Sequence, residues 1–503
     1  MRRLLIISIV FNTALAISAL ATVISIPNDY VSIQAGINAS ANGDTVLVQP
    51  GTYVENIYLE DHAVVLASLF LTTGDTSYIS QTIIDGNASG SVVTFHYQHL
   101  YTEGNSTLTG FTLQNGKGQY GGGISCRVSH PIISNNHIIN NISQDDGGGI
   151  FLWTGSDPVI SDNYITNNTA AERGGGIFIC WSHGTISNNT ICNNRALSGA
   201  GIFVTESDQA PISEFSGNLI ISNEASQNCG GLYIRRSKVS LSDMIISRNK
   251  SFFNCGGMYI EESKFSMSNI LVAKNEASGN CGGLYAERSV ITISNSTIAN
   301  NDAGSQYGSG LLLKNCPNDT IDGYVSIINT IIWNNSLSDT GIVSRQCSTY
   351  YCDTENARPG VGNISDDPLF CWPEISDYHL AENSPCVGTG EDGANIGAFG
   401  IGCATIDIPE NTSNLPSTFS LFQNYPNPFN ASTSISYTLP YDTNVKLDIY
   451  DVAGRHIETL SDLYQSVGSH QVTWNAQDYP SGAYFYKIQA GDFTETKMML
   501  LIK

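Results

Sequence analysis

Charged residues are scarce in this sequence, and basic residues are the scarcer kind. Only 13% of the 503 residues are charged, and 22 lysines and arginines stand against 45 aspartates and glutamates, so the net charge is −23. A protein that follows nucleic-acid phosphates needs a basic face. The composition therefore argues against a nucleic-acid partner and suits a soluble extracellular protein or one that contacts cations.

Long apolar runs are also lacking. The one that exists, residues 4–16, follows Arg2 and Arg3 and precedes a small-x-small sequence at residues 19–21. This pattern predicts a signal peptide over residues 1–21; an N-terminal membrane anchor is the alternative. No other segment approaches the roughly 20 apolar residues that span a bilayer, so we expect no transmembrane segment in the mature chain.

Cysteine pairs of the Cys-x-x-Cys type are absent, which argues against a structural zinc site. Twelve cysteines are present nevertheless, and an exported chain can form disulfides. The pairs Cys347/Cys352 and Cys371/Cys386 are the disulfide candidates. Three other cysteines lie 26 residues apart before the same Gly-Gly pair, so we expect them to stack in poor geometry for bonding and to remain free thiols. These three are Cys229, Cys255 and Cys281.

The most abundant feature is a repeat. A glycine pair or triplet, two or three large apolar residues, a polar stretch, Ile-Ser and paired asparagines recur eight times, with 25 to 30 residues between successive marker glycines. A fixed period of this length indicates a stacked solenoid. The last glycines of the eight copies are Gly123, Gly149, Gly176, Gly201, Gly231, Gly257, Gly283 and Gly310. The asparagines that keep the same period are Asn141, Asn168, Asn194, Asn223, Asn249, Asn275 and Asn301.

Each unit is predicted to be β-structure. Its apolar runs are too short for helices and are rich in β-branched and aromatic residues. Strands of neighbouring coils stack at about 4.8 Å, so equivalent residues lie above one another. Inward-facing asparagines would then form amide ladders; the alternative is that asparagine and glycine only mark turns.

The repeat resembles the right-handed parallel β-helix of pectate lyases and their many non-enzymatic relatives, over roughly residues 27–400. The phrases "GDTV" and "PGTY" in residues 43–53 resemble the N-terminal entry of such proteins. We therefore expect a cap and first coil over residues 22–60, with a short amphipathic helix near Ile33, and a parallel β-helix with its C-terminal cap over residues 61–403.

The chain changes character after the repeats. Residues 404–420 contain Pro409 and Pro416 and read as a linker. Residues 421–503 alternate as short strands, which predicts a small immunoglobulin-like β-sandwich. Its motifs "YPNPFN", "IYDVAGR" and "SGAYFYKI" resemble the C-terminal sorting domain of the type IX secretion system. The resemblance implies that the type IX machinery is a partner and that the protein is secreted or attached to the bacterial cell surface.

The second residue after the marker glycine is aromatic in six consecutive copies. Its neighbours on both sides are mostly aliphatic, and alternation along a strand puts the two sets on opposite faces. With the aliphatic residues inside, the aromatic residues form an exposed ladder that binds an extended polysaccharide. The alternative is that the rings face the core or cover the wall. The ladder residues are Phe151, Phe178, Phe203, Tyr233, Tyr259 and Tyr285.

Charged residues gather two to three positions further along. Arg235, Glu261, Glu287 and Arg288 are the candidates for acid–base catalysis, and solvated ion pairs at a turn are the alternative. No complete lyase, hydrolase or esterase constellation matches.

Calcium is the one cofactor left open. Asp145 and Asp146 are its candidate ligands, with turn-forming aspartates as the alternative. His130 and His183 lie two coils apart, about 10 Å, which is too far for a shared metal.

These features favour an exported β-helix protein that binds glycans or adheres without catalysis. A polysaccharide lyase or glycoside hydrolase acting on pectin-like or other extracellular polysaccharide is the first alternative. A structural surface component is the second.

Overall fold

The structure is a computed structural model of the whole chain. It describes residues 21–502 except 61–62, 97–104, 209–211, 305–307, 317–324, 337–339, 344–346, 357, 405–418, 425, 441–442, 466–467 and 492. The predicted signal peptide and most of the predicted linker therefore lie outside the described residues. Contacts divide the chain into two units, one up to residue 366 with residues 388–398, the other residues 367–387 and 399–503.

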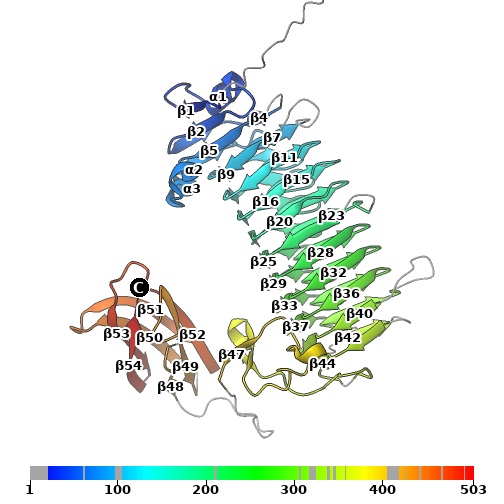
Figure 1. Cartoon of the computed structure of the whole chain (residues 1–503), viewed down its shortest axis with the longest axis vertical. Coiled ribbons are helices and arrows are strands. Elements are labelled where there is room, and N and C mark those ends of the chain that lie inside the picture. The colour runs from blue at the N-terminus through cyan, green and yellow to red at the C-terminus, as the bar shows by residue number, and fades with distance from the viewer. Residues whose placement is uncertain are drawn as a thin grey trace, which may run out of the picture. The chain divides into compact units, whose positions relative to one another are not determined.

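The first unit is a right-handed parallel β-helix of about 13 turns, as predicted (Figure 1). Each full coil visits four parallel sheets in turn, which we number walls 1 to 4. Wall 1 consists of β4 (Ile57–Leu59), β7 (Val93–His96), β11 (Ile124–Arg127), β15 (Ile150–Trp153), β19 (Ile177–Cys180), β23 (Ile202–Thr205), β27 (Leu232–Arg235), β31 (Met258–Glu261), β35 (Leu284–Glu287), β39 (Leu311–Lys314) and β42 (Thr340–Val343). Wall 2 consists of β1 (Val23–Ile26), β2 (Thr45–Val48), β5 (Val65–Ser68), β8 (Thr107–Thr109), β12 (Ile132–Ser134), β16 (Val159–Ser161), β20 (Thr185–Ser187), β24 (Ser213–Ser216), β28 (Lys238–Ser242), β32 (Lys264–Ser268), β36 (Val290–Ser294), β40 (Val325–Ile328) and β43 (Cys347–Tyr350).

The other two walls complete each coil. Wall 3 consists of β3 (Gly51–Val54), β6 (Thr82–Asp85), β9 (Thr112–Gln114), β13 (His137–Ile139), β17 (Tyr164–Thr166), β21 (Thr190–Cys192), β25 (Leu219–Ile221), β29 (Ile245–Ser247), β33 (Leu271–Ala273), β37 (Thr297–Ala299), β41 (Ile331–Trp333) and β44 (Asp353–Thr354). Wall 4, whose strands have two residues each, consists of β10 (Lys117–Gly118), β14 (Ile142–Ser143), β18 (Thr169–Ala170), β22 (Arg195–Ala196), β26 (Glu224–Ala225), β30 (Lys250–Ser251), β34 (Glu276–Ala277) and β38 (Asp302–Ala303).

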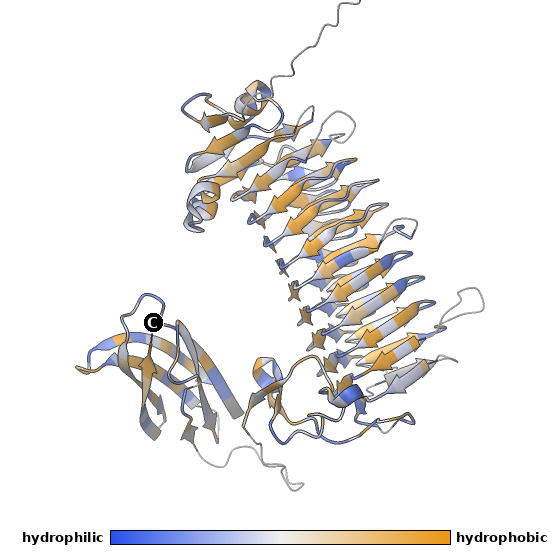
Figure 2. Cartoon of the chain, in the orientation of Figure 1, coloured by the Kyte–Doolittle hydropathy of each residue, from blue (hydrophilic) through white to orange (hydrophobic). Residues whose placement is uncertain are grey.

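The coils stack in strict register, so each side chain lies above its equivalent. Phe151 in β15 pairs with Phe178 in β19, and Leu152 with Ile179. One apolar core runs through the solenoid and contains the aliphatic residues of walls 1 to 3. Figure 2 shows the same pattern, with apolar segments on the strands and polar segments at the turns. Burial of this continuous aliphatic column is the main force that holds the coils together.

Paired asparagines serve two purposes at the corner between walls 3 and 4. The second of each pair is buried and forms a ladder: the Asn141 backbone N–H donates to the Asn168 side-chain oxygen at 3.0 Å, and the Asn141 amide donates to the same oxygen at 3.1 Å. The first of the pair, such as Asn140 or Asn167, has a φ near +55°. The sequence left open whether these asparagines form an amide ladder or only mark turns. The structure shows both roles on adjacent residues: the first asparagine of each pair forms the turn and the second forms the ladder.

The glycine triplets are required for two different reasons. The first glycine, such as Gly147, has a φ of +71°, and in three coils a cysteine takes this left-handed position. The third glycine has an ordinary φ but no room for a side chain: a Cβ added to Gly149 would lie 2.6 Å from the carbonyl oxygen of Gly176. Close approach of consecutive coils thus explains the repeated Gly-Gly pair.

Short helices lie at and near the N-terminal end of the solenoid. Helix α1 (Ile33–Ala39) begins at Ser32, whose hydroxyl accepts from the Ala35 backbone N–H at 3.2 Å. Its buried Ile33 and Ile37 join the solenoid core, and the helix contacts β1, β2 and β4. The predicted amphipathic helix thus covers part of the first coil, which would otherwise expose apolar core. Two further short helices are α2 (Phe70–Thr73) and α3 (Ser77–Gln81).

The segment after the coils contains a small sheet and a disulfide. Strands β45 (Phe370–Trp372) and β47 (Ile401–Cys403) both pair with β46 (Asp377–Ala381), and 3-10 helices lie at Pro373–Ile375 and Glu391–Gly393. This sheet brings Cys371 to Cys403, and these two form the disulfide. The predicted pairs were wrong, because pairing to β46 brings together cysteines that are distant in sequence. Cys347, Cys352 and Cys386 belong to no disulfide.

The C-terminal domain consists of two antiparallel sheets with a shared core, as predicted for a small β-sandwich. Asn424, which directly precedes the "YPNPFN" motif, is buried, and its amide donates to the Pro426 carbonyl and to the Thr433 hydroxyl at 3.1 and 2.9 Å. The motif therefore fixes a turn against this core. The strands of the sandwich are β48 (Ser420–Leu421), β49 (Ser432–Leu439), β50 (Thr443–Asp451), β51 (His456–Gln465), β52 (Gly468–Asn475), β53 (Gly482–Ala490) and β54 (Phe493–Leu501).

Candidate functional site

The six aromatic residues of the repeat form a continuous stack on the outward side of wall 1. Ring centroids of successive members lie 4.6 to 5.8 Å apart, and Tyr259 and Tyr285 are 6° from parallel. The aliphatic neighbours lie in the solenoid core and the rings do not, as alternation predicted.

The rings are nevertheless buried, so the expectation of an exposed ladder was wrong. None of Phe151, Phe178, Phe203, Tyr233, Tyr259 and Tyr285 exceeds 8% exposure. The turn that precedes each strand folds back over the outward face: a Cβ on Gly147 would lie 2.8 Å from the Cβ of Phe151. The guanidinium of Arg173 lies over Phe178 and Phe203, 5.0 and 5.4 Å from their centroids. The alternation of residues along a strand predicts which face a ring lies on but not whether a turn covers it. Because the rings are covered, none of them has a face exposed for a sugar.

Three cysteines complete this outer cluster. Cys229, Cys255 and Cys281 are fully buried free thiols packed with the tyrosine rings. The Cys255 thiol donates to the Met258 carbonyl oxygen at 2.7 Å. The prediction of stacked thiols without a disulfide is confirmed.

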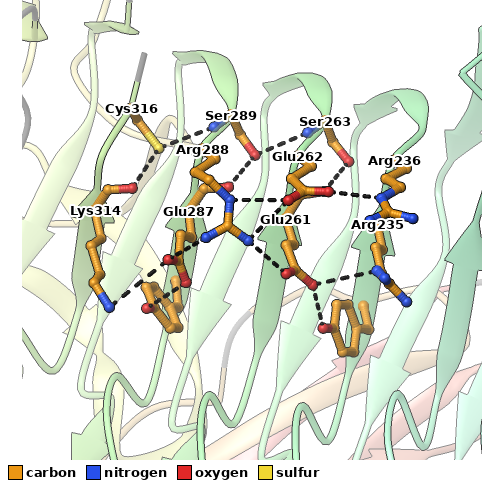
Figure 3. A network of polar contacts seen from close by, with 12 residues as sticks. Arg235, Arg236, Glu261, Glu262, Ser263, Glu287, Arg288, Ser289, Lys314 and Cys316 are labelled. Carbon is orange, nitrogen blue, oxygen red and sulfur yellow. Dashed lines mark hydrogen bonds and ion pairs between the residues drawn. The ribbon is translucent and has the colours of Figure 1, made fainter. Parts of the chain in front are cut away.

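The charged residues after wall 1 form a ladder of ion pairs across adjacent coils (Figure 3). Arg288 contacts three carboxylates, with nitrogen–oxygen distances of 3.0 Å to Glu261, 3.0 Å to Glu262 and 2.8 Å to Glu287. Arg236 contacts Glu262 at 2.7 Å. The hydrogen bond from Arg236 lowers the pKa of the Glu262 carboxyl.

This network lacks the features of a catalytic acid–base pair. Arg235 lies 3.7 Å from Glu261, which also accepts a hydrogen bond from the Tyr233 hydroxyl at 2.9 Å. Each carboxylate of the cluster thus has a cationic partner, whereas a general acid needs a raised pKa. The geometry favours ion pairs at a turn over the four-residue catalytic candidate Arg235, Glu261, Glu287 and Arg288.

The candidate calcium ligands have other partners. Asp146 is buried, and Arg173 donates to both of its carboxylate oxygens, at 3.0 and 2.8 Å. Burial raises the pKa of the Asp146 carboxyl, against the opposing effect of Arg173. Over the part of the chain that the structure describes, no group of three or more histidine, cysteine or acidic side chains is placed to hold a metal. Calcium at Asp145 and Asp146 stays a prediction, and this ion pair does not favour it.

The corner between walls 1 and 2, which carries the ion pairs of Arg236, Glu262 and Arg288, carries tryptophans in earlier coils. Trp153 and Trp181 pack edge to face with ring centroids 5.1 Å apart, and Trp181 is 52% exposed. Trp181 occupies the fifth position after the marker glycine, where φ is +48°. Later coils place Arg236, Glu262 and Arg288 at this position, also with positive φ. The left-handed turn directs each of these side chains away from the core.

Two histidines meet one aspartate in the same turns between walls 1 and 2, a few residues after the tryptophans in sequence. Asp157 lies between His130 and His183, with Nδ1–carboxylate distances of 3.5 and 2.8 Å. The histidines share a carboxylate, although their spacing across two coils argued against a shared metal. We call the set His130, Trp153, Asp157, Trp181 and His183 the tryptophan corner. Sequence reasoning named both histidines but did not single out either tryptophan or Asp157; register alignment of the fifth position would have found the exposed tryptophan.

Comparisons with known families agree with both parts of the chain. Residues 67–230 match the family described as the right handed beta helix region, and residues 423–503 match the secretion system C-terminal sorting domain. No curated protein matches the chain.

Fold and comparisons together define a right-handed parallel β-helix protein with a C-terminal sorting domain. The sorting domain marks it as a type IX secretion substrate, exported to the cell surface or the extracellular space. Among the described residues, no helix has the length and apolarity to cross a membrane.

Proposed function

We propose that this exported β-helix protein binds extracellular glycans without catalysis and that the tryptophan corner is the binding site. The observation that carries the proposal is that Trp181 is exposed to solvent while its ring packs edge to face with Trp153. Edge-to-face packing occupies at most one face of one ring, so Trp181 keeps indole surface in contact with solvent. An exposed aromatic surface of this kind marks an interaction site more often than ordinary surface.

Polar groups at the corner supply the other half of sugar recognition. Asp157 and the two histidines are each a little over a quarter exposed, so their outer atoms reach solvent. A carboxylate accepts hydrogen bonds from sugar hydroxyls, and an imidazole nitrogen donates or accepts. A few fixed polar groups beside an aromatic surface are the usual composition of a small-ligand site.

Apolar surface continues from the corner onto wall 2. Ile132 and Val159 pair in register there, and both are exposed. Further along the solenoid the equivalent corner is filled by the ion pairs of Arg236, Glu262 and Arg288. The site is therefore confined to the coils that contain Trp153 and Trp181.

Glycan binding tests the proposal directly. The purified protein, Trp181→Ala and Tyr58→Ala are titrated calorimetrically with neutral and acidic oligosaccharides; Tyr58 is an equally exposed aromatic residue, at 51%. We expect Trp181→Ala to weaken binding at one site at least tenfold, about 1.4 kcal/mol, and Tyr58→Ala to match the wild type. Wild-type affinity together with wild-type stoichiometry in Trp181→Ala overturns the site, and release of cleaved product by the wild type overturns the non-catalytic role.

A further inference from the structure

A groove crosses wall 4, on the opposite side of wall 1 from the tryptophan corner. Two adjoining hollows of about 450 and 290 Å³ share Thr169, Arg195 and Glu224 in their lining. These three residues are the outward members of β18, β22 and β26, which pair in register. The floor of the groove therefore spans three consecutive coils.

The two flanks of the groove differ chemically. On the side of wall 3, Asn167, Asn193 and Ser222 line it, and all three have a φ near +55° that directs their side chains outward. On the opposite side, Leu197 and Phe252 line it, and Phe252 is 52% exposed. Amides and hydroxyls thus face an aromatic and aliphatic surface across the floor.

Charges in and beside the groove compensate one another. Arg195 lies 3.1 Å from Glu224, and Lys250 lies 2.9 Å from Glu276 on the next coils. The ammonium of Lys250 also lies 5.8 Å from the centroid of the Phe252 ring. A ligand with a large charge of either sign would have to break these pairs, whereas a neutral polar ligand would not.

The backbone of wall 4 has no hydrogen-bonding groups to offer an added strand here. Strands β18, β22 and β26 pair with the coils on both sides. Recognition of an extended peptide by strand addition needs an open sheet edge. The ligand must therefore be recognised through side chains.

We propose that this groove is a second binding site, for a neutral glycan chain. A sugar unit has an apolar ring face and hydroxyls at its edge, which match Phe252 and Leu197 on one flank and the amides of Asn167 and Asn193 on the other. The Arg195–Glu224 pair supplies a donor and an acceptor at the floor. The groove and the tryptophan corner lie on different sides of one coil stack. If the tryptophan corner binds glycan as proposed, the protein can therefore bridge two glycan chains. The groove proposal itself does not depend on the proposal for the corner.

Calorimetry with neutral hexasaccharides distinguishes the two sites. The probes are cellohexaose, xylohexaose, mannohexaose and maltohexaose, with hexagalacturonate as the acidic comparison. Phe252→Ala and Arg195→Ala are compared with Phe253→Ala, an exposed neighbour that does not line the groove. We expect both groove variants to lose at least tenfold in affinity at one site and Phe253→Ala to match the wild type.

The outcomes separate the groove from the corner. In Trp181→Ala the groove should keep its affinity, and the stoichiometry should fall by one site. An unchanged Trp181→Ala with defective groove variants would overturn only the tryptophan corner. Wild-type affinity in both groove variants, no binding of any neutral probe, or tighter binding of hexagalacturonate that the groove variants abolish overturns the groove as a neutral-glycan site.

Discussion

Tyr259 and Tyr285 stack face to face on adjacent coils, with ring centroids 4.7 Å apart. This distance is the spacing of the coils themselves, so the solenoid holds the rings in contact without distorting either strand. Each ring face is in contact with a neighbour, and the covering turn excludes water from the stack. The hydroxyls are the polar ends of these residues: that of Tyr285 donates to Glu287 at 3.1 Å.

This stack should make the protein sensitive to alkali. Burial, and then the nearby carboxylates, raises the pKa of Tyr233, Tyr259 and Tyr285 above the ordinary 10.0. The folded state therefore binds these protons more tightly than the unfolded state. Stability is unaffected below pH 10.0, where both states are protonated, and falls as pH rises above it.

The loss of folding stability in alkali is large enough to measure. Each of the three tyrosines contributes up to about 1.4 kcal/mol of lost stability per pH unit. Replacing all three with phenylalanine, the residue found at this position in Phe151, Phe178 and Phe203, should reduce the loss between pH 10 and 11. Unfolding midpoints by circular dichroism measure it, and equal alkaline slopes in both proteins would contradict the assignment.

A second prediction concerns the asparagine ladder. Asn249 accepts hydrogen bonds from the backbone N–H and the side-chain amide of Asn223 and donates to the Ile220 carbonyl. In Asn249→Ala these buried partners lose a hydrogen bond, at about 1–3 kcal/mol each. We expect a destabilisation above about 3 kcal/mol, read from denaturant unfolding. Lys274→Asn is the matched control: it places asparagine at a position with φ of +56° where other coils already have it, and should be neutral.

The fold could be predicted from the sequence because the residues that repeat with its period are ones that the structure requires at those positions. Gly149 has no room for a Cβ, and Asn141 satisfies buried backbone groups, so both residue types recur through the copies of the repeat. The site could not be predicted as well, because exposure depends on turns that the period does not describe. Phe151 and Trp181 are both aromatic and point away from the core, but in the folded protein a turn covers Phe151 and leaves Trp181 in solvent.

A third prediction concerns the cysteines. The structure has ten free thiols and one disulfide, Cys371–Cys403, among twelve cysteines. Denaturation without reductant should expose ten reactive thiols, and reduction should raise the number to twelve. Peptide mapping should find Cys229, Cys255 and Cys281 alkylated and the peptides of Cys371 and Cys403 linked. A disulfide within the first three would contradict the stacked-thiol arrangement.

The last prediction concerns export. The sorting domain has its own apolar core, separate from that of the solenoid, and the predicted linker leads into it. Removing residues 420–503 should therefore leave the coils folded but without the address that the type IX machinery reads. We expect the truncated protein to accumulate in the periplasm of a type IX-secreting host, with the circular dichroism of a β-protein.

Joining residues 405–503 to an unrelated periplasmic protein tests whether the tail is sufficient for export, and that fusion should reach the surface or the medium. Because misfolding is checked separately by circular dichroism, arrival of the truncated protein outside the cell would show that the address lies elsewhere in the chain.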